Sequence, residues 1–199
     1  MSQNNQAVFE TEKKFRCTDV EGVIQHALSI GFIKTHENIG EHDIYFTDKE
    51  HHFIEQRICL RIRQTEVHCE ITHKWVSVDK WALYSKLENN IQIPHNNKEN
   101  AISLLQSLWF LKDVDVKKIR NLYRKKIEKL VYTIAIDYIE NTGYFVELEI
   151  VSQYAMQKKE TQTIFNAFVD LFNDFNLQEE ILPYRDIVRS SKSKQSKTK

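Results

Sequence analysis

Three charged residues near the start of the chain, Glu10, Glu12 and Lys14, occupy alternate positions. If residues 7–16 form a β-strand, alternate side chains point to one face, so two carboxylates and one ammonium group lie together. An isolated pattern of this kind is also typical of an ordinary strand surface in contact with water. It gains weight here because charged and apolar residues alternate again in later segments.

Basic residues dominate the polar face of the central segments. In the segment 58–64, Arg61 and Arg63 share one face, and isoleucine and leucine side chains take the other. The same alternation adds further basic residues to the polar face, namely Lys74, Lys86, Lys118 and Arg120. Arginine binds phosphate through two parallel hydrogen bonds, and lysine acts as a point charge. Together with Lys14, these residues favour a polyphosphate ligand.

Apart from Glu88, the acidic residues of the charged faces gather on the first and the last two predicted strands: Glu10, Glu12, Asp137, Glu147 and Glu149. Carboxylate oxygens suit hard cations such as Mg²⁺ or Mn²⁺, which also bridge phosphate oxygens. If the charged face closes on itself, its charges need partners, a metal ion or a ligand, because unpaired buried charges are costly. Such a site can stabilise a phosphoryl-transfer transition state. The alternative is a two-layer sheet whose charged face is simply hydrated.

The elements that position these residues follow from hydrophobic periodicity. Period-two alternation predicts strands at 7–16, 42–47, 58–64, 67–76, 85–93, 117–126, 131–139 and 144–151. Helical spacing of apolar residues predicts helices between Asp19 and Gly31, over 97–110 and over 160–175. Strands with one apolar face and three amphipathic helices indicate an α+β fold with the helices packed on the apolar face.

Composition limits the classes of protein to which the chain can belong. Its 199 residues include 41% apolar residues and carry no net charge, which argues against a general nucleic-acid binder. No signal peptide and no run of 18 apolar residues is visible, and three cysteines without metal spacing fit a reducing compartment. We therefore expect a cytoplasmic protein without membrane or nucleic-acid partners. Residues 1–189 predict one domain, and 190–199 a disordered Ser/Lys-rich tail.

Five short motifs then occur in a specific order. They are E-x-E-x-K (Glu10, Glu12, Lys14), L-R-x-R (Leu60 to Arg63), T-x-K (Thr72, Lys74), K-x-R-x-x-Y (Lys118, Arg120, Tyr123) and D-x₅-G-x₃-E-x-E (Asp137, Gly143, Glu147, Glu149). In this order they resemble the CYTH family, the triphosphate tunnel metalloenzymes, over roughly residues 7–188. That family includes class IV adenylate cyclases, thiamine triphosphatases and inorganic triphosphatases.

The resemblance implies a fold and a role for each matched residue. It implies an eight-stranded antiparallel β-barrel, open at both ends, with helices outside. It would assign metal binding to Glu10, Glu12, Asp137, Glu147 and Glu149. It would assign triphosphate binding to Lys14, Arg61, Arg63, Lys74, Lys86, Lys118 and Arg120. It would also make Tyr45 and Lys74 a catalytic pair that activates the attacking water.

Two departures from the family pattern keep several functions open. Lys86 stands where arginine is commoner, and Asn90 stands where many members have an acid. We expect Mg²⁺- or Mn²⁺-dependent hydrolysis of inorganic triphosphate, thiamine triphosphate or a nucleoside triphosphate. The alternative is a class IV adenylate cyclase that makes cyclic AMP and pyrophosphate from ATP. Because Asn90 lacks a charge, a non-catalytic polyphosphate or nucleotide binder remains a third hypothesis, and the chain could act as a monomer or homodimer.

Overall fold

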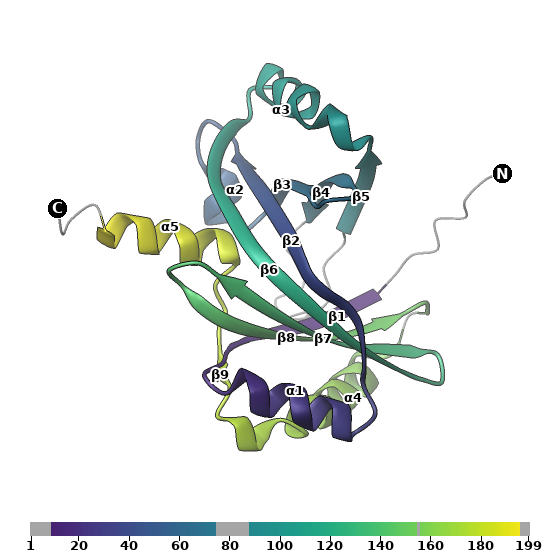
Figure 1. Ribbon diagram of the computed structural model, residues 1–199. Coiled ribbons are helices and arrows are strands. Elements are labelled where there is room, and N and C mark those ends of the chain that lie inside the picture. Colours follow the sequence, from purple (N-terminus) through teal and green to yellow (C-terminus); the bar gives the residue numbers. More distant parts are fainter. Residues whose placement is uncertain (1–8, 75–87, 155, 196–199) are drawn as a thin grey trace.

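The computed structural model describes residues 9–74, 88–154 and 156–195. One antiparallel sheet dominates these residues, with the strand order β5-β4-β3-β2-β6-β7-β8-β1-β9 (Figure 1). Its strands are β1 (Phe9–Arg16), β2 (Ile33–Thr47), β3 (Cys59–Gln64), β4 (Cys69–Lys74), β5 (Glu88–Ile93), β6 (Leu111–Ile127), β7 (Leu130–Ile139), β8 (Gly143–Ser152) and β9 (Gln178–Glu179). The helices are α1 (Val20–Ser29), α2 (His52–Glu55), α3 (Lys98–Ser107), α4 (Lys158–Asp170) and α5 (Tyr184–Gln195), with short 3₁₀ turns at His95–Asn97 and Asn173–Phe175.

The α+β class predicted from the sequence is confirmed, with one difference in the sheet. The prediction of eight strands is wrong by one, because the two-residue strand β9 adds to the edge beside β1. Strands β5 and β9 form the two edges, and within the described residues no hydrogen-bonded ladder joins them. The barrel is therefore not closed by strand pairing in this part of the chain.

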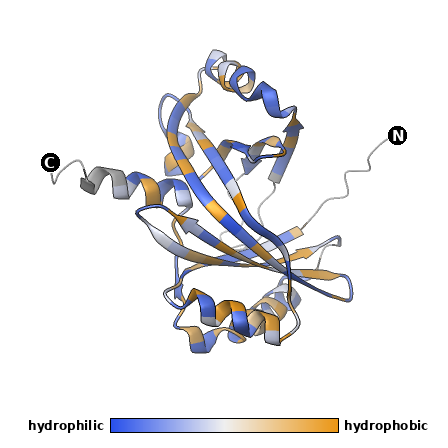
Figure 2. Cartoon of the chain, viewed as in Figure 1, coloured by the Kyte–Doolittle hydropathy of each residue, from blue (hydrophilic) through white to orange (hydrophobic). Residues whose placement is uncertain are grey.

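Two groups of helices cover the outer face of the sheet. Helices α1 and α4 pack against β1, β6, β7 and β8, where Val23 and Phe168 meet Phe15 and Leu148 in a buried cluster. These two helices lie together below the strands in Figure 1. Helix α3 covers β2 and β3 at the opposite end of the sheet. Figure 2 shows hydrophobic and hydrophilic residues alternating along the strands, as a sheet with one apolar face requires.

Helix α5 packs differently, because it lies on the polar side of the sheet. Its residues Ile187 and Val188 are buried against Tyr45, Val116 and Phe145, whose side chains share a face with the inward charged residues. The helix continues to Gln195, so residues 190–195, which the sequence assigns to a disordered tail, are helical. None of the helices in the described parts of the chain is long and apolar enough to cross a membrane.

Strands β2 and β6 join the two ends of the sheet and are much longer than the sequence predicts. Strand β2 has 15 residues and β6 has 17, and they pair along their length with several register shifts. Residues 33–38 of β2 are exposed, so no apolar alternation marks them as a strand. Their strand geometry comes from pairing with β6, which is a tertiary effect.

Candidate functional site

The strand register brings the predicted acidic residues of β1 and β8 side by side. Glu12 lies opposite Glu149, and Lys14 lies opposite Glu147, in the antiparallel pair of these strands. We call the face that carries these residues the concave face. Directly opposite residues on one face of an antiparallel pair come within contact of each other. Like-charged groups placed this close repel unless a cation lies between them.

This repulsion contributes to a raised pKa of Glu149. Burial raises its pKa to about 8, and the carboxylates of Glu10, Glu12 and Glu147 act in the same direction. A divalent cation among these oxygens would remove the repulsion and restore the ionised form. The donor set of Glu10, Glu12 and Glu149 therefore fits a hard cation such as Mg²⁺ or Mn²⁺.

Asp137 and Glu147 have a different environment, because Arg120 lies between them. Arg120 donates to Asp137 from Nε at 2.6 Å and contacts Glu147 through Nη2. Asp137 has no exposed surface, and Lys118 Nζ lies 3.5 Å from its Oδ2. Burial opposes ionisation of Asp137, but Arg120 and Lys118 outweigh it and lower its pKa. Asp137 thus holds two cations in place, and its role as a metal ligand stays a prediction.

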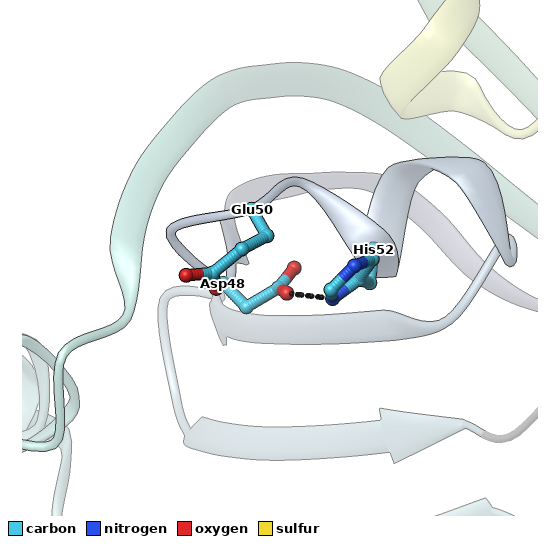
Figure 3. A group of neighbouring side chains, drawn as sticks. All are labelled: Asp48, Glu50 and His52. Carbon is cyan, nitrogen blue, oxygen red and sulfur yellow. Dashed lines mark ion pairs between the residues drawn. The ribbon is translucent and has the colours of Figure 1, made fainter.

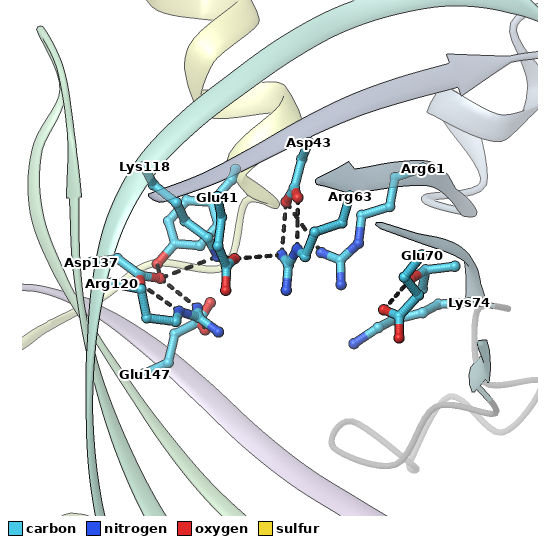
Figure 4. A network of polar contacts seen from close by, with 12 residues as sticks. Glu41, Asp43, Arg61, Arg63, Glu70, Lys74, Lys118, Arg120, Asp137 and Glu147 are labelled. Atoms are coloured by element: carbon cyan, nitrogen blue, oxygen red, sulfur yellow. Dashed lines mark hydrogen bonds and ion pairs between the residues drawn. The ribbon is translucent and has the colours of Figure 1, made fainter. Parts of the chain in front are cut away.

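The basic residues of β3 are held by an acid that we did not predict from the sequence. Asp43 on β2 is fully buried and accepts two hydrogen bonds from Arg63, from Nε at 2.6 Å and from Nη2 at 2.7 Å. Arg61 donates to the same carboxylate at 3.4 Å. Although burial opposes it, the two arginines lower the pKa of Asp43 well below its ordinary value. Asp43 thereby holds both arginine side chains in place on the concave face, as Figure 4 shows.

Glu41, another β2 residue, links the two basic groups. Its Oε2 lies 3.1 Å from Arg63 Nη2 and 3.0 Å from Lys118 Nζ. Figure 4 shows this chain of contacts running from Asp137 through Lys118 and Glu41 to Arg63. Four of the predicted phosphate-binding residues, Arg61, Arg63, Lys118 and Arg120, therefore belong to one connected network.

One contact shows that β4 and β1, which lie near opposite edges of the sheet, face each other. Lys74 Nζ on β4 lies 3.9 Å from Glu10 Oε2 on β1. In the sheet these strands are separated by β3, β2, β6, β7 and β8. The sheet must therefore curl until β4, with its basic residue Lys74, comes close to β1, with its acidic residue Glu10. This geometry encloses the concave face as the sequence resemblance implies.

The remaining predicted residues have separate environments. Lys14 donates to the carbonyl of Leu182 and lies over the Tyr184 ring, and burial lowers its pKa. Tyr45 is buried against α5, and burial raises the pKa of its hydroxyl, so it stays protonated. The catalytic pair of Tyr45 and Lys74 stays a prediction. Lys86 lies outside the described residues.

The sequence analysis missed Glu41, Asp43 and Tyr184. Glu41, Asp43 and Tyr45 occupy alternate positions, so a predicted strand that began before residue 42 would have placed these three on one face. The signal was lost because the exposed first half of β2 shows no alternation. Tyr184 enters the site from a helix, which strand periodicity cannot reveal.

A second acidic group lies outside the concave face. Asp48 and Glu50 in the loop after β2 and His52, the first residue of α2, have candidate ligand atoms within 4.8 Å of one another (Figure 3). Asp48 is already engaged, since its Oδ2 lies 2.9 Å from His52 Nδ1 and its Oδ1 accepts from the Phe53 amide at 2.9 Å. These contacts explain the group as the turn that leads into α2.

The family profile of the CYTH domain matches residues 9–180. The chain belongs to the CYTH family. This domain covers β1 through β9, so all the charged residues of the concave face lie inside it.

Relatives of this CYTH domain carry names that point to nucleotide chemistry. A protein of Methanocaldococcus jannaschii, "Putative adenylate cyclase MJ0240", is 31% identical over 143 residues, which are 71% of this chain and 77% of that protein. A solved structure of a "putative adenylate cyclase" from Vibrio parahaemolyticus is 20% identical with a TM-score of 0.71, covering 91% of this chain and 98% of its own. The Hippeastrum protein HpAC1 is 16% identical with a TM-score of 0.64, covering 91% and 95%. The two structures show that the CYTH domain shares their fold.

The buried acids of this CYTH domain predict how its stability depends on pH. The pKa values of Asp43, Asp137 and Glu41 are lower in the folded protein than in the unfolded chain. Their contribution to stability is fully present above about pH 4, the unfolded value, and is lost as the pH falls toward the folded values. Without metal, the raised pKa of Glu149 acts in the opposite direction, because the folded protein binds this proton up to about pH 8 and the unfolded chain does not. We therefore expect the free energy of unfolding in urea to rise as the pH falls from about 8 to 5, and to fall steeply between about pH 4 and 2. A flat profile below about pH 4 would show that these acids are not paired as described.

Proposed function

We propose that the protein is a divalent-metal-dependent enzyme that hydrolyses the terminal phosphoryl group of a triphosphate. The supporting observation is the sorting of charge across the concave face. Carboxylates on β1 and β8 face arginines and lysines from β3, β4 and β6, and the Lys74–Glu10 contact spans the two sides. A triphosphate with its metal ion carries both kinds of charge that such a face can bind.

The basic residues would hold the phosphate chain. Asp43 and Asp137 fix the planes of Arg63 and Arg120, so these guanidinium groups are oriented before a ligand arrives. Pre-oriented donors stabilise the charge that develops on the transferred phosphoryl group. Lys118 on β6 and Lys14 on β1 add point charges to the same face.

The carboxylates would hold the metal. Glu10, Glu12 and Glu149 would be its ligands, and when bound, Mg²⁺ or Mn²⁺ neutralises phosphate charge and orients the terminal group. We assign Asp137 to orienting Arg120 and Lys118 instead. Lys74 lies within reach of the acidic edge and would position the terminal phosphoryl group next to the attacking water. We leave Tyr45 out of proton transfer because its buried hydroxyl keeps its proton.

Cyclisation of ATP to cyclic AMP is the second candidate function. It is favoured by the name of the Methanocaldococcus jannaschii relative, while HpAC1, which shares the fold, is described as having a dominant triphosphatase activity. The same basic residues would serve both reactions, which differ in the phosphorus attacked and in the nucleophile. In either case the partner is a small-molecule triphosphate.

Product analysis by ³¹P NMR separates these functions. The protein would be incubated with Mg²⁺ and, separately, with inorganic triphosphate, thiamine triphosphate and ATP. We expect orthophosphate from at least one substrate, complete loss of turnover with a chelator, and recovery when Mg²⁺ or Mn²⁺ is added back. Pyrophosphate with cyclic AMP would instead establish the cyclase.

A matched pair of lysine variants shows whether the turnover comes from this protein or from a contaminating phosphatase. Lys74→Ala removes a charge from the concave face, whereas Lys34→Ala removes an exposed lysine that pairs with Glu37 at 2.7 Å and lies over the Tyr123 ring on the outer face. Turnover should fall at least tenfold in the first variant and stay unchanged in the second. Tight binding of a triphosphate without turnover of any substrate would show that the protein is a binding module and not an enzyme.

A further inference from the structure

Helix α5 contributes one side chain, Tyr184, to the charged network of the concave face. We propose that Tyr184 is a positioning residue that orients three cations of the triphosphate site, Lys14, Lys118 and Arg120. The inference rests on the proposed function, because it assigns these cations to a triphosphate. It adds a residue from outside the strands, and it makes the docking of α5 part of ligand binding.

The hydroxyl of Tyr184 acts on Arg120 through Asp137. It donates a hydrogen bond of 2.7 Å to Asp137 Oδ2, and both groups are buried. The same carboxylate holds Arg120 through its Nε at 2.6 Å and lies 3.5 Å from Lys118 Nζ. A buried carboxylate with three donors has little freedom to turn. The Tyr184 hydroxyl therefore helps to fix the direction in which Arg120 presents its remaining N–H groups.

The ring of Tyr184 acts directly on the two lysines. Lys14 Nζ lies 4.2 Å from the ring centroid, and Lys118 Nζ lies 5.0 Å from it. Ammonium groups at these distances are attracted to the face of an aromatic ring, more strongly where water is excluded. Lys14 is also held by the carbonyl of Leu182, two residues before Tyr184. One short segment thus fixes lysines from two strands, β1 and β6, which are not neighbours in the sheet.

The position of Tyr184 is itself fixed by the rest of α5. Its ring meets the Phe145 ring edge to face, with centroids 5.2 Å apart. Arg185 is 2% exposed and donates to the carbonyl of Ile58 at 2.9 Å, while Arg189 forms an ion pair with Asp113 on β6. The helix is therefore anchored beside β3 and on β6. An aromatic side chain held this firmly can preorganise the charges around it.

A purely structural role is the competing explanation. In that case Tyr184 would only anchor α5, and its loss would lower stability without a specific effect on triphosphate affinity. The two roles separate if affinity and stability are measured on the same variants. Tyr184→Phe keeps the ring and removes the hydroxyl, and Tyr184→Leu removes both interactions.

The test is calorimetric titration with imidotriphosphate in Mg²⁺, because its bridging nitrogen resists hydrolysis. Because the hydroxyl donates to a charged carboxylate that orients Arg120, Tyr184→Phe should weaken binding about tenfold. Tyr184→Leu should weaken it by about a further threefold to tenfold, since the ring attraction to two ammonium groups is also lost. In turnover assays KM should rise, and kcat should fall as well, because the oriented cations also stabilise the charge that develops on the transferred phosphoryl group.

Tyr144→Phe is the matched control, because Tyr144 is exposed and its ring lies against that of Tyr138 on the outer face. It should leave both affinity and KM unchanged. If the wild-type protein does not bind imidotriphosphate, the proposed function is overturned and this inference with it. If the wild type binds and both Tyr184 variants bind equally well, only the inference is overturned. Should Tyr184→Leu fail to fold, Tyr184→Phe alone decides, with melting temperatures recorded for each variant.

Discussion

Glu12→Gln is expected to abolish metal-dependent turnover and at the same time to stabilise the protein in the absence of metal. Glu12 lies opposite Glu149 across the β1–β8 pair, and its charge is one of those that raise the pKa of Glu149. An amide of the same shape removes this repulsion but is a poor ligand for a hard cation. Since outer-shell changes alone typically cost 10–100-fold in metal affinity or activity, we expect a loss on the order of 100-fold or more.

The measurement compares kcat/KM with the melting temperature at low and high Mg²⁺. In wild type, Mg²⁺ should raise the melting temperature, because it binds the folded state. In Glu12→Gln the metal-free melting temperature should be higher than in wild type, and the shift on adding Mg²⁺ should shrink. Glu179→Gln is the control, since Glu179 pairs with Lys13 on the neighbouring strand at the surface. Normal turnover by Glu12→Gln would show that the metal binds elsewhere, with Asp48, Glu50 and His52 the next group to replace.

Asp43→Asn is expected to destabilise the fold by about 3–5 kcal/mol, because it removes one partner from a buried ion network. Arg61 and Arg63 would remain largely buried beside an uncharged amide, and Arg63 would keep its ion pair with Glu41. The midpoint of urea unfolding should drop with an unchanged slope, since the surface exposed on unfolding stays the same.

Asp115→Asn provides a comparison on the neighbouring strand. Asp115 is about one-third exposed and pairs with His42 at 3.0 Å and Lys112 at 3.1 Å. Exposed pairs of this kind contribute about 1 kcal/mol or less. Equal destabilisation by the two variants would contradict the view that Asp43 anchors the arginines in a buried network. Asp43→Asn should also flatten the acid limb of the stability profile.

Sequence patterns predicted much of this arrangement, and the failures have physical causes. Alternation sufficed for Glu12, Arg61 and Lys74, because each lies in a strand with one apolar face. Asp43 was missed since half of β2 is exposed on both sides and becomes a strand only by pairing with β6. Its role as an anchor for two arginines depends on register between strands, which one segment of sequence does not contain.

Asp137 shows the same limit in another form. Its position in the motif predicted a metal ligand, and its carboxylate is indeed on the concave face. Its neighbours Arg120 and Tyr184, however, come from a strand and from a distant helix, and they occupy its oxygens. Helix α5 carried no strong hydrophobic pattern beyond its first turn, because lysine and serine fill its later positions. The buried residues that dock it, Tyr184, Ile187 and Val188, all lie near its beginning.

The two-residue strand β9 has a consequence for how the protein behaves in a crowded solution. It pairs with Phe15 and Arg16 at the end of β1, and Lys13 and Arg16 form ion pairs of 2.9 Å with Glu179 and Glu180. An unpaired strand edge invites another chain to add to it, which leads to aggregation. Because β9 covers this end of β1, fewer backbone groups there are free to pair with an incoming chain. The charged side chains at this place also oppose the approach of another strand. The segment that leads to α5 thus also keeps neighbouring molecules from joining their sheets.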